Sequence, residues 1–356
     1  MKTAIIFGVT GQDGSYLLEL LLSKGYKVIG VNRRTSSENT SRITYSLDNS
    51  NFELVQGDIT DPFSVYRILS DYTPNEVYNL AAQSHVGVSF KQASLTWSIT
   101  AVGCMNILEA MRSMASPPRF YQASSSEMFG DQFSTAPNLS LNEKGHHYPK
   151  QEPYQNEDTP FSPQSPYAIA KCAAHHSVRL YRKSYNLYAC GGILFNHESE
   201  RRGLEFVTRK ISNYVGGLEW ATRTGRSIPK LHLGNLLAKR DWGHAEDYVE
   251  AMWMMLQQDE PDDYVIATGK SYSVEDYVKE AFKCINIEEY LDFIEVDKSL
   301  VRPSEVPYLR GSYKKAFMKM GWKPKTDFNR LVERMVDHDI QSRFQYGKSE
   351  AEISQS

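Results

Sequence analysis

Two side chains four residues apart, Tyr167 and Lys171, form the first constellation in this sequence that is able to carry out chemistry. At the start of a predicted helix both lie on one face and can meet the same ligand. An ammonium beside a phenol stabilises the phenolate and lowers its pKa, which gives a general base for work near neutral pH. Because the chain has 22 tyrosines, one such pair is expected by chance, so its weight depends on the motifs around it.

A run of three serines and a glutamate, Ser124 to Glu127, ends a predicted strand. Ligands of wound parallel sheets bind at the carboxyl ends of the strands, so hydroxyls such as that of Ser125 are placed to bind a reacting sugar. Glu127 precedes an apolar Met-Phe pair and is able to act as acid and base in turn. From spacing alone an alternative is equally open, in which the serines cap a turn and Glu127 is a surface carboxylate.

Three glycines, Gly8, Gly11 and Gly14, stand between a predicted first strand and first helix. Backbone without Cβ atoms can approach a pyrophosphate that is held at the helix N-terminus. The spacing G-x-x-G-x-x-G differs by one residue from the usual dinucleotide fingerprint but supports the same geometry. The position of the loop therefore predicts a dinucleotide site.

The end of the predicted second strand carries Asn32, Arg33 and Arg34 where an acidic residue usually binds a free ribose hydroxyl. Guanidinium groups form charge-assisted, often bidentate bonds to phosphate, which favours NADP over NAD. The alternative is a pair of solvated loop cations. Asp58, after the third predicted strand, is a candidate contact for the adenine.

The elements that must position these residues alternate between short β-branched runs and helical patterns, which is typical of an α/β fold. We predict a Rossmann-type doubly wound parallel sheet with a smaller C-terminal α/β lobe that binds substrate. The dinucleotide domain is expected over 1–197, with 241–270 returning to it, the lobe over 198–240 and 271–347, and a disordered tail over 348–356. Strands are predicted over 3–8, 27–31, 52–56, 76–80, 120–124 and 188–195, helices over 15–24, 62–70, 100–114, 166–185, 206–220, 246–257, 274–283 and 328–344, and a polar loop over 131–163.

Composition excludes several classes of protein. A formal net charge of -3 and a pI near 6.3 provide no basic field for nucleic acid or for an anionic membrane surface, and no apolar run is long enough to span a bilayer. The four cysteines are far apart with no C-x-x-C pair, and the adjacent His175 and His176 point to different helix faces, so no disulfide framework and no metal site are expected. We expect a cytoplasmic protein.

With these motifs assembled, the chain resembles the extended short-chain dehydrogenases, and among them the GDP-mannose 4,6-dehydratase family, over nearly its whole length. The runs that carry the resemblance are G-V-T-G-Q-D-G from Gly8, Arg33-Arg34 with N-T-S-R-I from Asn39, A-A-Q-S-H-V from Ala81, N-H-E-S from Asn196, K-R-D-W-G-H-A from Lys239, R-P-S-E-V from Arg302 and G-W-K-P from Gly321. Runs of this length are far more specific than any single motif.

The resemblance implies a lyase that removes water from a GDP-linked hexose with no net redox change, in a homodimer or homotetramer whose segment 33–42 lies near a subunit contact. Tyr167 would accept the O4 proton, Lys171 would position the nicotinamide ribose, Glu127 would carry out the elimination, and Ser125 would assist them. The cofactor residues would be Gly8, Thr10, Gly11, Gln12, Asp13, Gly14, Arg33, Arg34, Asp58, Ile59, Leu80, Ala81, Gln83, Ser84, Tyr167, Lys171, His197 and Arg202. The sugar nucleotide would be held by Ser84, Ser126, Glu127, Asn196, Lys210, Arg240, Arg302 and Glu305.

The chain departs from the family pattern at four places. Ser125 replaces a threonine, Leu95 replaces a tyrosine that contacts the cofactor, and the stretches 131–151 and 223–229 are additional. Because both stretches are able to reshape the sugar pocket, a modified sugar such as GDP-manno-heptose is an alternative substrate. A nucleotide-sugar 4-epimerase or reductase would share the glycine loop and Tyr167 but would not need Glu127. A catalytically idle cofactor-binding protein would need neither Tyr167 nor Glu127.

Overall fold

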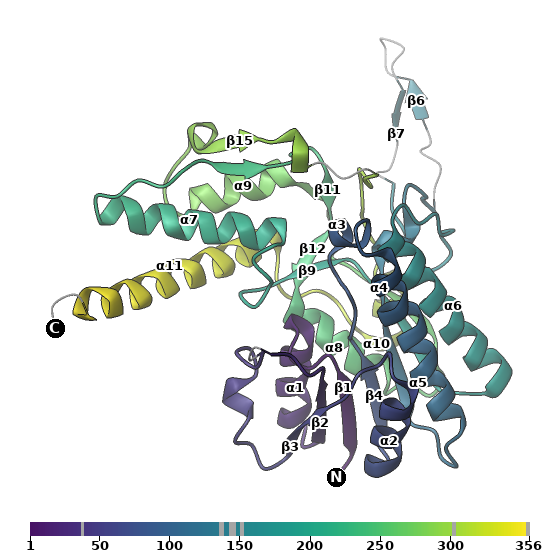
Figure 1. Ribbon diagram of the computed structural model, residues 1–356. Coiled ribbons are helices and arrows are strands. Elements are labelled where there is room, and N and C mark those ends of the chain that lie inside the picture. Colours follow the sequence, from purple (N-terminus) through teal and green to yellow (C-terminus); the bar gives the residue numbers. More distant parts are fainter. Residues whose placement is uncertain (37–38, 135–138, 142–146, 150–152, 301–303, 354–356) are drawn as a thin grey trace.

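The structure is a computed structural model and describes residues 1–36, 39–134, 139–141, 147–149, 153–300 and 304–353. Its centre is a sheet of seven parallel strands in the order β13-β8-β5-β4-β1-β2-β3 (Figure 1). Strand order reverses between β1 and β4, and such a switch point is where wound sheets bind ligands. The strands are β1 (Thr3–Phe7), β2 (Lys27–Asn32), β3 (Phe52–Gln56), β4 (Glu76–Asn79), β5 (Arg119–Ser125), β8 (Ala189–Leu194) and β13 (Asp263–Ile266).

Helices cover both faces of the sheet, which confirms the predicted doubly wound α/β fold. Successive apolar side chains of β1 enter opposite cores, Ile6 on one face and Ile5 on the other, so the strand is a continuous apolar run. On the Ile6 face lie α1 (Gln12–Ser23), α8 (Ala245–Met255) and α10 (Lys314–Met320). On the Ile5 face lie α2 (Pro62–Tyr72), α5 (Gly103–Arg112) and α6 (Pro166–Tyr185).

A second, smaller group of elements stands beyond the carboxyl end of the sheet and has its own apolar core (Figure 1). It contains α7 (Val207–Arg223), α9 (Val274–Lys283) and α11 (Phe328–Ile353), with β10 (Leu231–Leu233) parallel to β15 (Ile294–Val296). This is the predicted C-terminal α/β lobe. Two small strand pairs lie near it, β9 (Asn196–Glu198) with β12 (Trp242–His244) and β11 (Lys239–Arg240) with β14 (Tyr272–Ser273).

The remaining described elements are short. They are α3 (Val86–Ser89), α4 (Ala93–Trp97), the π-helical turn η2 (Ser98–Val102), and the 3-10 turns η1 (Thr44–Ser46), η3 (Ser126–Phe129), η4 (Tyr290–Phe293) and η5 (Lys298–Leu300). Within the predicted polar loop, β6 (Leu139–Leu141) and β7 (His147–Pro149) pair antiparallel and project from the body of the molecule (Figure 1). Much of the additional stretch around them lies outside the described residues.

Local sequence signals explain the element boundaries that were predicted correctly. Helix α6 begins at a proline after Ser165, whose hydroxyl accepts a hydrogen bond from the Ala168 N–H at 3.1 Å, and it ends at left-handed Asn186. Helix α9 begins with a capping box formed by Ser273 and Asp276. The bounds of β3, α6 and α9 agree with the prediction.

Several predicted bounds differ by one to three residues, and two predicted helices differ more. The helix expected over 100–114 is divided into the π-helical turn η2 and α5, and its approach through α3 and α4 was not foreseen, because neither short helix holds a full apolar period. Helix α11 continues to Ile353, past the predicted end at 344 and into the predicted tail. Residues 348–353 include Lys, Glu and Ala, which favour a helix even without an apolar face. Among the described helices, none is long and apolar enough to cross a membrane.

Candidate active site

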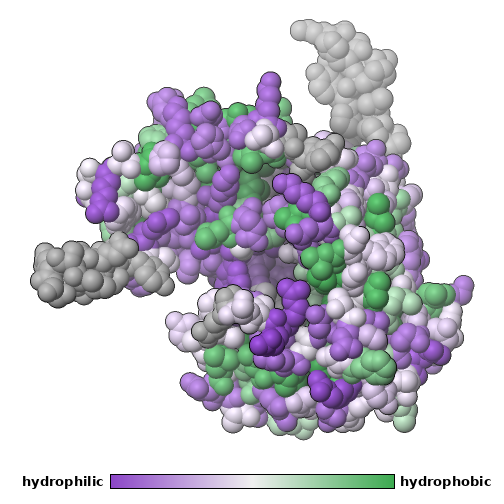
Figure 2. Space-filling view, viewed as in Figure 1, coloured by the Kyte–Doolittle hydropathy of each residue, from purple (hydrophilic) through white to green (hydrophobic). Residues whose placement is uncertain are grey.

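A cavity of about 400 Å³ lies between the carboxyl end of the sheet and the smaller lobe. The space-filling view is hollowed between these two parts, and hydrophilic residues border the hollow (Figure 2). The predicted residues that line it on the sheet side are Asp13, Leu80, Ser84, Ser125, Ser126, Glu127, Tyr167 and Lys171. Those that line it from the later segments are Asn196, His197, Arg202, Lys210, Arg240 and Glu305.

The pair Tyr167 and Lys171 occupies the first two turns of α6, which packs against β5. Both residues are more than nine-tenths buried and line the cavity. The ammonium of Lys171 donates to the backbone carbonyl of Ala123 at 2.6 Å and lies 5.7 Å from the centre of the Tyr167 ring. The helix spacing therefore brings phenol and ammonium to one site, as the sequence indicated.

The pKa values of this pair differ from the prediction. Burial raises the pKa of Tyr167 to about 12, and a hydrogen bond with the Ser125 side chain lowers it only in part. Burial likewise lowers the pKa of Lys171 to about 8, against smaller opposing contributions from Cys104 and Asp13. The expected lowering of the tyrosine pKa by its neighbour is therefore wrong for the protein alone, because desolvation outweighs the charge of an ammonium that is bonded elsewhere.

The serine run at the end of β5 supplies both a cap and a side chain for the cavity. Ser125 begins η3, and its hydroxyl accepts a hydrogen bond from the Glu127 N–H at 3.2 Å. Ser126 and Glu127 follow in that turn and line the cavity, with Glu127 only partly buried. The turn-capping role is therefore confirmed for Ser125, which also hydrogen bonds to Tyr167, whereas binding of a sugar by the serines stays a prediction.

A buried histidine ties these two elements together, and sequence reasoning missed its role. His175 lies two turns after Tyr167 on α6, and its Nδ1 lies 2.9 Å from the Ser124 hydroxyl. Burial lowers the pKa of His175 to about 4, so the imidazole is neutral near pH 7. Its other nitrogen lies 3.7 Å from Asp263, which also receives a bond from Arg182 at 2.5 Å. The signal was present as the i, i+4, i+8 spacing of Tyr167, Lys171 and His175.

The glycine loop has the close backbone packing that a dinucleotide site requires. Gly8 has φ of 87°, and a Cβ atom there would lie 2.9 Å from the Ala81 nitrogen. A Cβ on Gly14 would lie 2.3 Å from the Gly8 oxygen. Helix α1 begins after Gly11, which provides no side-chain cap, and the free N–H groups of a helix N-terminus are the groups that bind a pyrophosphate. These residues fit a dinucleotide cofactor.

An ion pair joins two of the predicted cofactor residues. The His197 Nε2 lies 2.8 Å from the Asp13 carboxylate, and its Nδ1 lies 2.8 Å from the Phe195 carbonyl. Burial alone would raise the pKa of Asp13, but the charge and hydrogen bond of His197, together with the Gln12 hydrogen bond and the charge of Arg202, lower that pKa to about 2. Burial would lower the pKa of His197, yet Asp13 raises it. The imidazole also stacks on Tyr248, with ring centres 4.7 Å apart.

Several other predicted cofactor residues lie beside the cavity rather than in its lining. The Gln12 amide donates to Asp13 and to the His197 carbonyl, at 2.9 and 3.1 Å. Gln83 bonds to the backbone of His85, and Asp58 accepts from the backbone and hydroxyl of Thr60. These side chains shape the loops around the glycine motif. Thr10, Ile59 and Ala81 likewise lie outside the lining; the first two are buried and Ala81 is partly buried.

The two arginines that favoured NADP are exposed and directly follow β2. Strand β2 is adjacent to β1, so Arg33 and Arg34 follow the strand next to the glycine loop, where an adenosine ribose lies in wound dinucleotide folds. Their position therefore fits the predicted contact with a 2′-phosphate.

The smaller lobe brings cationic side chains to the cavity. The Arg202 guanidinium lies 3.1 Å from the Glu198 carboxylate and over the Phe206 ring. Lys210 donates to the His232 carbonyl at 2.6 Å, and Glu305 accepts from Asn235 at 3.1 Å. These groups provide positive charge and polar contacts opposite the serine run.

Arg240 is nine-tenths buried in β11, and one of its nitrogens donates to the Lys239 carbonyl at 2.9 Å. A salt bridge from Arg240 to Asp241 was considered from the sequence. The oxygens of Asp241 instead accept bonds from Thr268, Gly269 and Gly311, at 2.7 to 3.1 Å. Through these bonds, Asp241 holds the strand that carries Arg240 against the neighbouring loops.

Two further places named in the sequence prediction, Leu95 and 223–229, are not in the cavity lining. Arg302 lies outside the described residues. Leu95, on α4, is 44% exposed, and 223–229 forms the exposed end of α7 and the turn after it. No group of three or more His, Cys, Asp or Glu among the described residues is arranged to hold a metal ion. The prediction also missed several lining residues. His85 and Trp242 lie in runs quoted for the resemblance but were given no role, and Glu205 and Phe206 lie in none of these runs.

The fold is shared with solved nucleotide-sugar enzymes. A structure described as dTDP-glucose 4,6-dehydratase from Bacillus anthracis in complex with NAD matches with a TM-score of 0.78 and 20% identity, over 97% of this chain and 98% of that one. A structure described as RMD from Pseudomonas aeruginosa complexed with NADPH matches with a TM-score of 0.72 and 18% identity, over 96% of this chain and 100% of that one. The chain therefore shares the fold of these two proteins, whose structures contain NAD and NADPH, respectively.

Sequence comparison places the chain more narrowly. A family model described as GDP-mannose 4,6 dehydratase matches residues 5–335. A GDP-mannose 4,6 dehydratase of Arabidopsis thaliana is 47% identical over 96% of this chain and 90% of its own length. The human GDP-mannose 4,6 dehydratase is 44% identical over 96% of this chain and 92% of its own length. The chain belongs to the GDP-mannose 4,6-dehydratase family of nucleotide-sugar 4,6-dehydratases.

Proposed function

We propose that the protein is an NADP-dependent lyase that converts GDP-mannose into GDP-4-keto-6-deoxymannose and water. The observation that carries the proposal is that Glu127 lines the same cavity as Tyr167 and Lys171, two residues after the serine that hydrogen bonds to the tyrosine. Family membership supports the GDP-mannose substrate.

The first step is loss of the O4 proton to Tyr167. A phenol with a pKa of about 12 is protonated near neutral pH, so its action as a base requires positive charge beside it. Lys171 supplies one such charge from the next turn of α6. Bound NADP would supply a second positive charge and the hydride chemistry, with C4 as donor and C6 as final acceptor of the same hydride, so the net redox change would be zero.

The second step is elimination of water across C5 and C6, and it belongs to Glu127. Oxidation at C4 makes the C5 proton acidic, and the carboxylate takes that proton. The carboxylic acid then protonates the C6 hydroxyl, which leaves as water. When C6 receives the hydride, C5 regains a proton, which balances the proton that Tyr167 accepted from O4. An epimerase performs no elimination and has no need of this carboxylate.

The cofactor would be held by the glycine loop, by Asp13 and His197, and by Arg33 and Arg34 around the 2′-phosphate. The sugar nucleotide would lie against Ser84, Ser126, Asn196, Lys210, Arg240, Arg302 and Glu305. The corresponding division of the chain is a dinucleotide domain over 1–197 and 241–270 and a substrate lobe over 198–240 and 271–347. We further propose a cytoplasmic homodimer or homotetramer, which sedimentation of the purified protein would test.

One observation keeps a modified sugar as a second candidate. In the chain, the pair β6 and β7 lies between Glu127 and Tyr167, the two residues proposed above to act at C5 and O4. An insertion there can change which substituent fits at C6. GDP-manno-heptose, which carries one more carbon at that position, is the alternative substrate.

The decisive experiment incubates the protein with GDP-mannose and NADP and determines the product by mass. We expect a product lighter by one water, and turnover of GDP-manno-heptose but not of GDP-mannose would contradict the favoured substrate. In Glu127→Gln, oxidation at C4 proceeds but elimination stops, so NADPH absorbance accumulates on the enzyme and kcat falls by about 100-fold. Glu205→Gln, which removes another carboxylate of the lining, is the matched control. Dehydration by Glu127→Gln at the parent rate would remove its assignment.

A further inference from the structure

Residues 197–201, here called the strap, follow the lining residue Asn196 and lie along helix α1. Alternate side chains of the strap reach α1. His197 pairs with Asp13, the Ser199 hydroxyl donates to Gln12 at 2.8 Å, and Arg201 donates to Ser15 at 3.0 Å. The strap therefore holds the first turns of the helix that follows the glycine loop.

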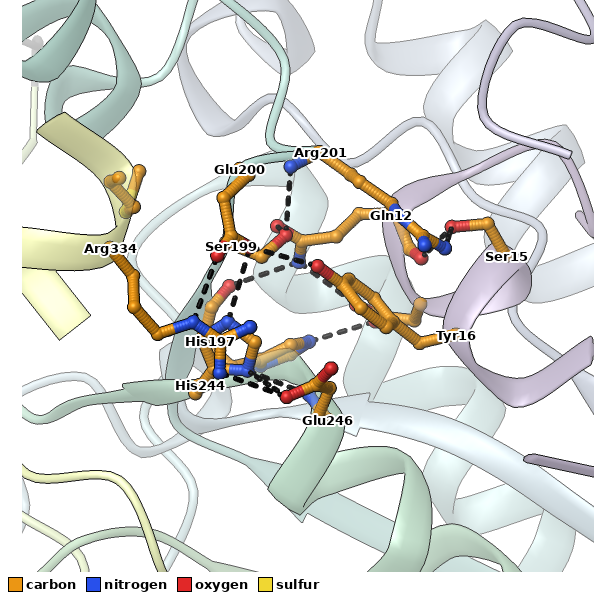
Figure 3. Close-up of polar contacts among 12 residues, drawn as sticks. Gln12, Ser15, Tyr16, His197, Ser199, Glu200, Arg201, His244, Glu246 and Arg334 are labelled. Atoms are coloured by element: carbon orange, nitrogen blue, oxygen red, sulfur yellow. Dashed lines mark hydrogen bonds and ion pairs between the residues drawn. The ribbon is translucent and has the colours of Figure 1, made fainter. Parts of the chain in front are cut away.

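Glu200, between these residues, connects the strap to three separate helices (Figure 3). One oxygen accepts from the Tyr16 hydroxyl of α1 at 2.9 Å and lies 3.3 Å from the His244 Nε2 at the start of α8. The other oxygen accepts from the Arg334 Nε of α11 at 2.9 Å. The carboxylate is thus the point at which the dinucleotide helix meets the long helix of the smaller lobe.

The surroundings of Glu200 favour its ionised form. Its side chain is 15% exposed, and His244 is fully buried. Burial by itself would raise the pKa of Glu200, but the hydrogen bond from His244 and the charge of Arg334 outweigh it and lower that pKa. The His244 Nδ1 accepts from the Glu246 backbone N–H, so its Nε2 carries the proton that points to Glu200. A buried carboxylate with donors from three helices fixes their relative positions.

Glu200 does not line the cavity, so any effect on the cofactor passes through its neighbours. The path is short. Ser199 bonds to Gln12, and the Gln12 amide donates to the Asp13 carboxylate and to the His197 carbonyl. A shift of the strap therefore moves Asp13 and His197 together, the two residues proposed above to contact the cofactor.

We infer that Glu200 is a positioning residue that sets NADP affinity by holding the strap between α1 and Arg334 of the smaller lobe. The inference rests on the proposed function, because it takes Asp13 and His197 as cofactor contacts. Its consequence is that a residue of α11, in the other lobe, controls cofactor binding through Glu200. Arg334 also pairs with Glu246 at 3.0 Å, so α8 shares in the same framework.

The test measures binding of NADPH and of GDP separately, by calorimetry, to the full chain. In Glu200→Gln we expect NADPH affinity to fall about tenfold, which equals about 1.4 kcal/mol, while GDP affinity changes by less than about twofold. Arg334→Met is expected to act in the same direction. The double variant is expected to bind NADPH no more than about twofold weaker than Glu200→Gln, because both changes break the same interaction between Glu200 and Arg334.

Two further variants keep the test decisive. Tyr16→Phe removes one donor to Glu200 and keeps the ring. If Glu200→Gln folds poorly, this variant is expected to show a smaller loss of NADPH affinity in a folded protein. Arg330→Met, on the same helix, breaks only an exposed pair with Glu333 and is the matched control, with unchanged NADPH affinity. Equal NADPH affinity in folded Glu200→Gln or Tyr16→Phe, or additive losses in the double variant, would overturn the inference. Failure of the unmodified protein to bind NADPH would instead overturn the proposed cofactor.

Discussion

The junction of β5 with α6 and the strap along α1 border one cavity, but their surroundings shift the pKa values of their ionisable side chains in opposite senses. At the junction, burial moves the pKa of Tyr167 upward and that of Lys171 downward, and both shifts favour the neutral forms. In the strap, paired charges move the pKa of Asp13 downward and that of His197 upward, and both shifts favour the ionised forms.

This difference follows from what each region bonds to. Lys171 donates to a backbone carbonyl and His175 bonds to a serine hydroxyl, so the charges near them are too weak to offset desolvation. The strap sets cations against carboxylates, such as Arg334 against Glu200 at 2.9 Å and Arg201 against Glu19 at 2.8 Å. The first arrangement makes its tyrosine and lysine responsive to the charge of a ligand, and the second keeps a fixed framework around it.

The largest expected effect tests the junction. Tyr167→Phe removes the proton acceptor but keeps the ring, so kcat should fall by about 1000-fold, the range of general acid-base contributions. Steady-state kinetics gives the loss, and calorimetry should show NADPH affinity within about threefold of the parent, because the strap is intact. A loss confined to NADPH affinity would mean that the two regions do not divide the work in this way.

The next effect tests the ionised strap by pH. The folded pKa of Asp13, about 2, lies below its unfolded value of 3.8, so the pair stabilises the fold above pH 4 and this contribution is lost as the pH falls through 2. The shift corresponds to about 2 kcal/mol of unfolding free energy. Denaturant unfolding at pH 6 and pH 3 should therefore show a smaller acid loss in Asp13→Asn than in the parent. Equal acid losses would show that the pair is not ionised.

The smallest expected effect tests whether exposed charges, like the paired charges of the strap, contribute to cofactor binding. Replacing Arg33 and Arg34 by serine removes two cations that are open to solvent, so we expect the preference for NADPH over NADH to fall by about tenfold. Lys24→Ser, which removes an exposed cation that lies over the Trp253 ring, is the control. An unchanged preference would separate the arginines from cofactor selection.

The fold and the junction were predictable because both depend on local pattern. Apolar runs between glycine signals gave the strands, and the four-residue spacing of Tyr167 and Lys171 placed them on one helix face. The sequence-based pKa argument failed for a tertiary reason, since burial and the carbonyl of Ala123 are supplied by β5, distant in sequence.

The strap was not predictable from pattern at all. Its residues contact α1, about 185 positions earlier, and α11, about 134 positions later. No periodicity records which of many charged residues will be paired across such separations. Glu200 was accordingly passed over, although its neighbour His197 was named through the resemblance.

The most direct test of the central claim, dehydration with return of the same hydride, uses GDP-mannose with deuterium at C4. The account predicts that the protein with NADP yields a product lighter by one water with the deuterium at C6, as read by mass spectrometry and NMR. Deuterium that stays at C4 with no loss of water, as in an epimerase, or deuterium released on NADPH, would contradict the account.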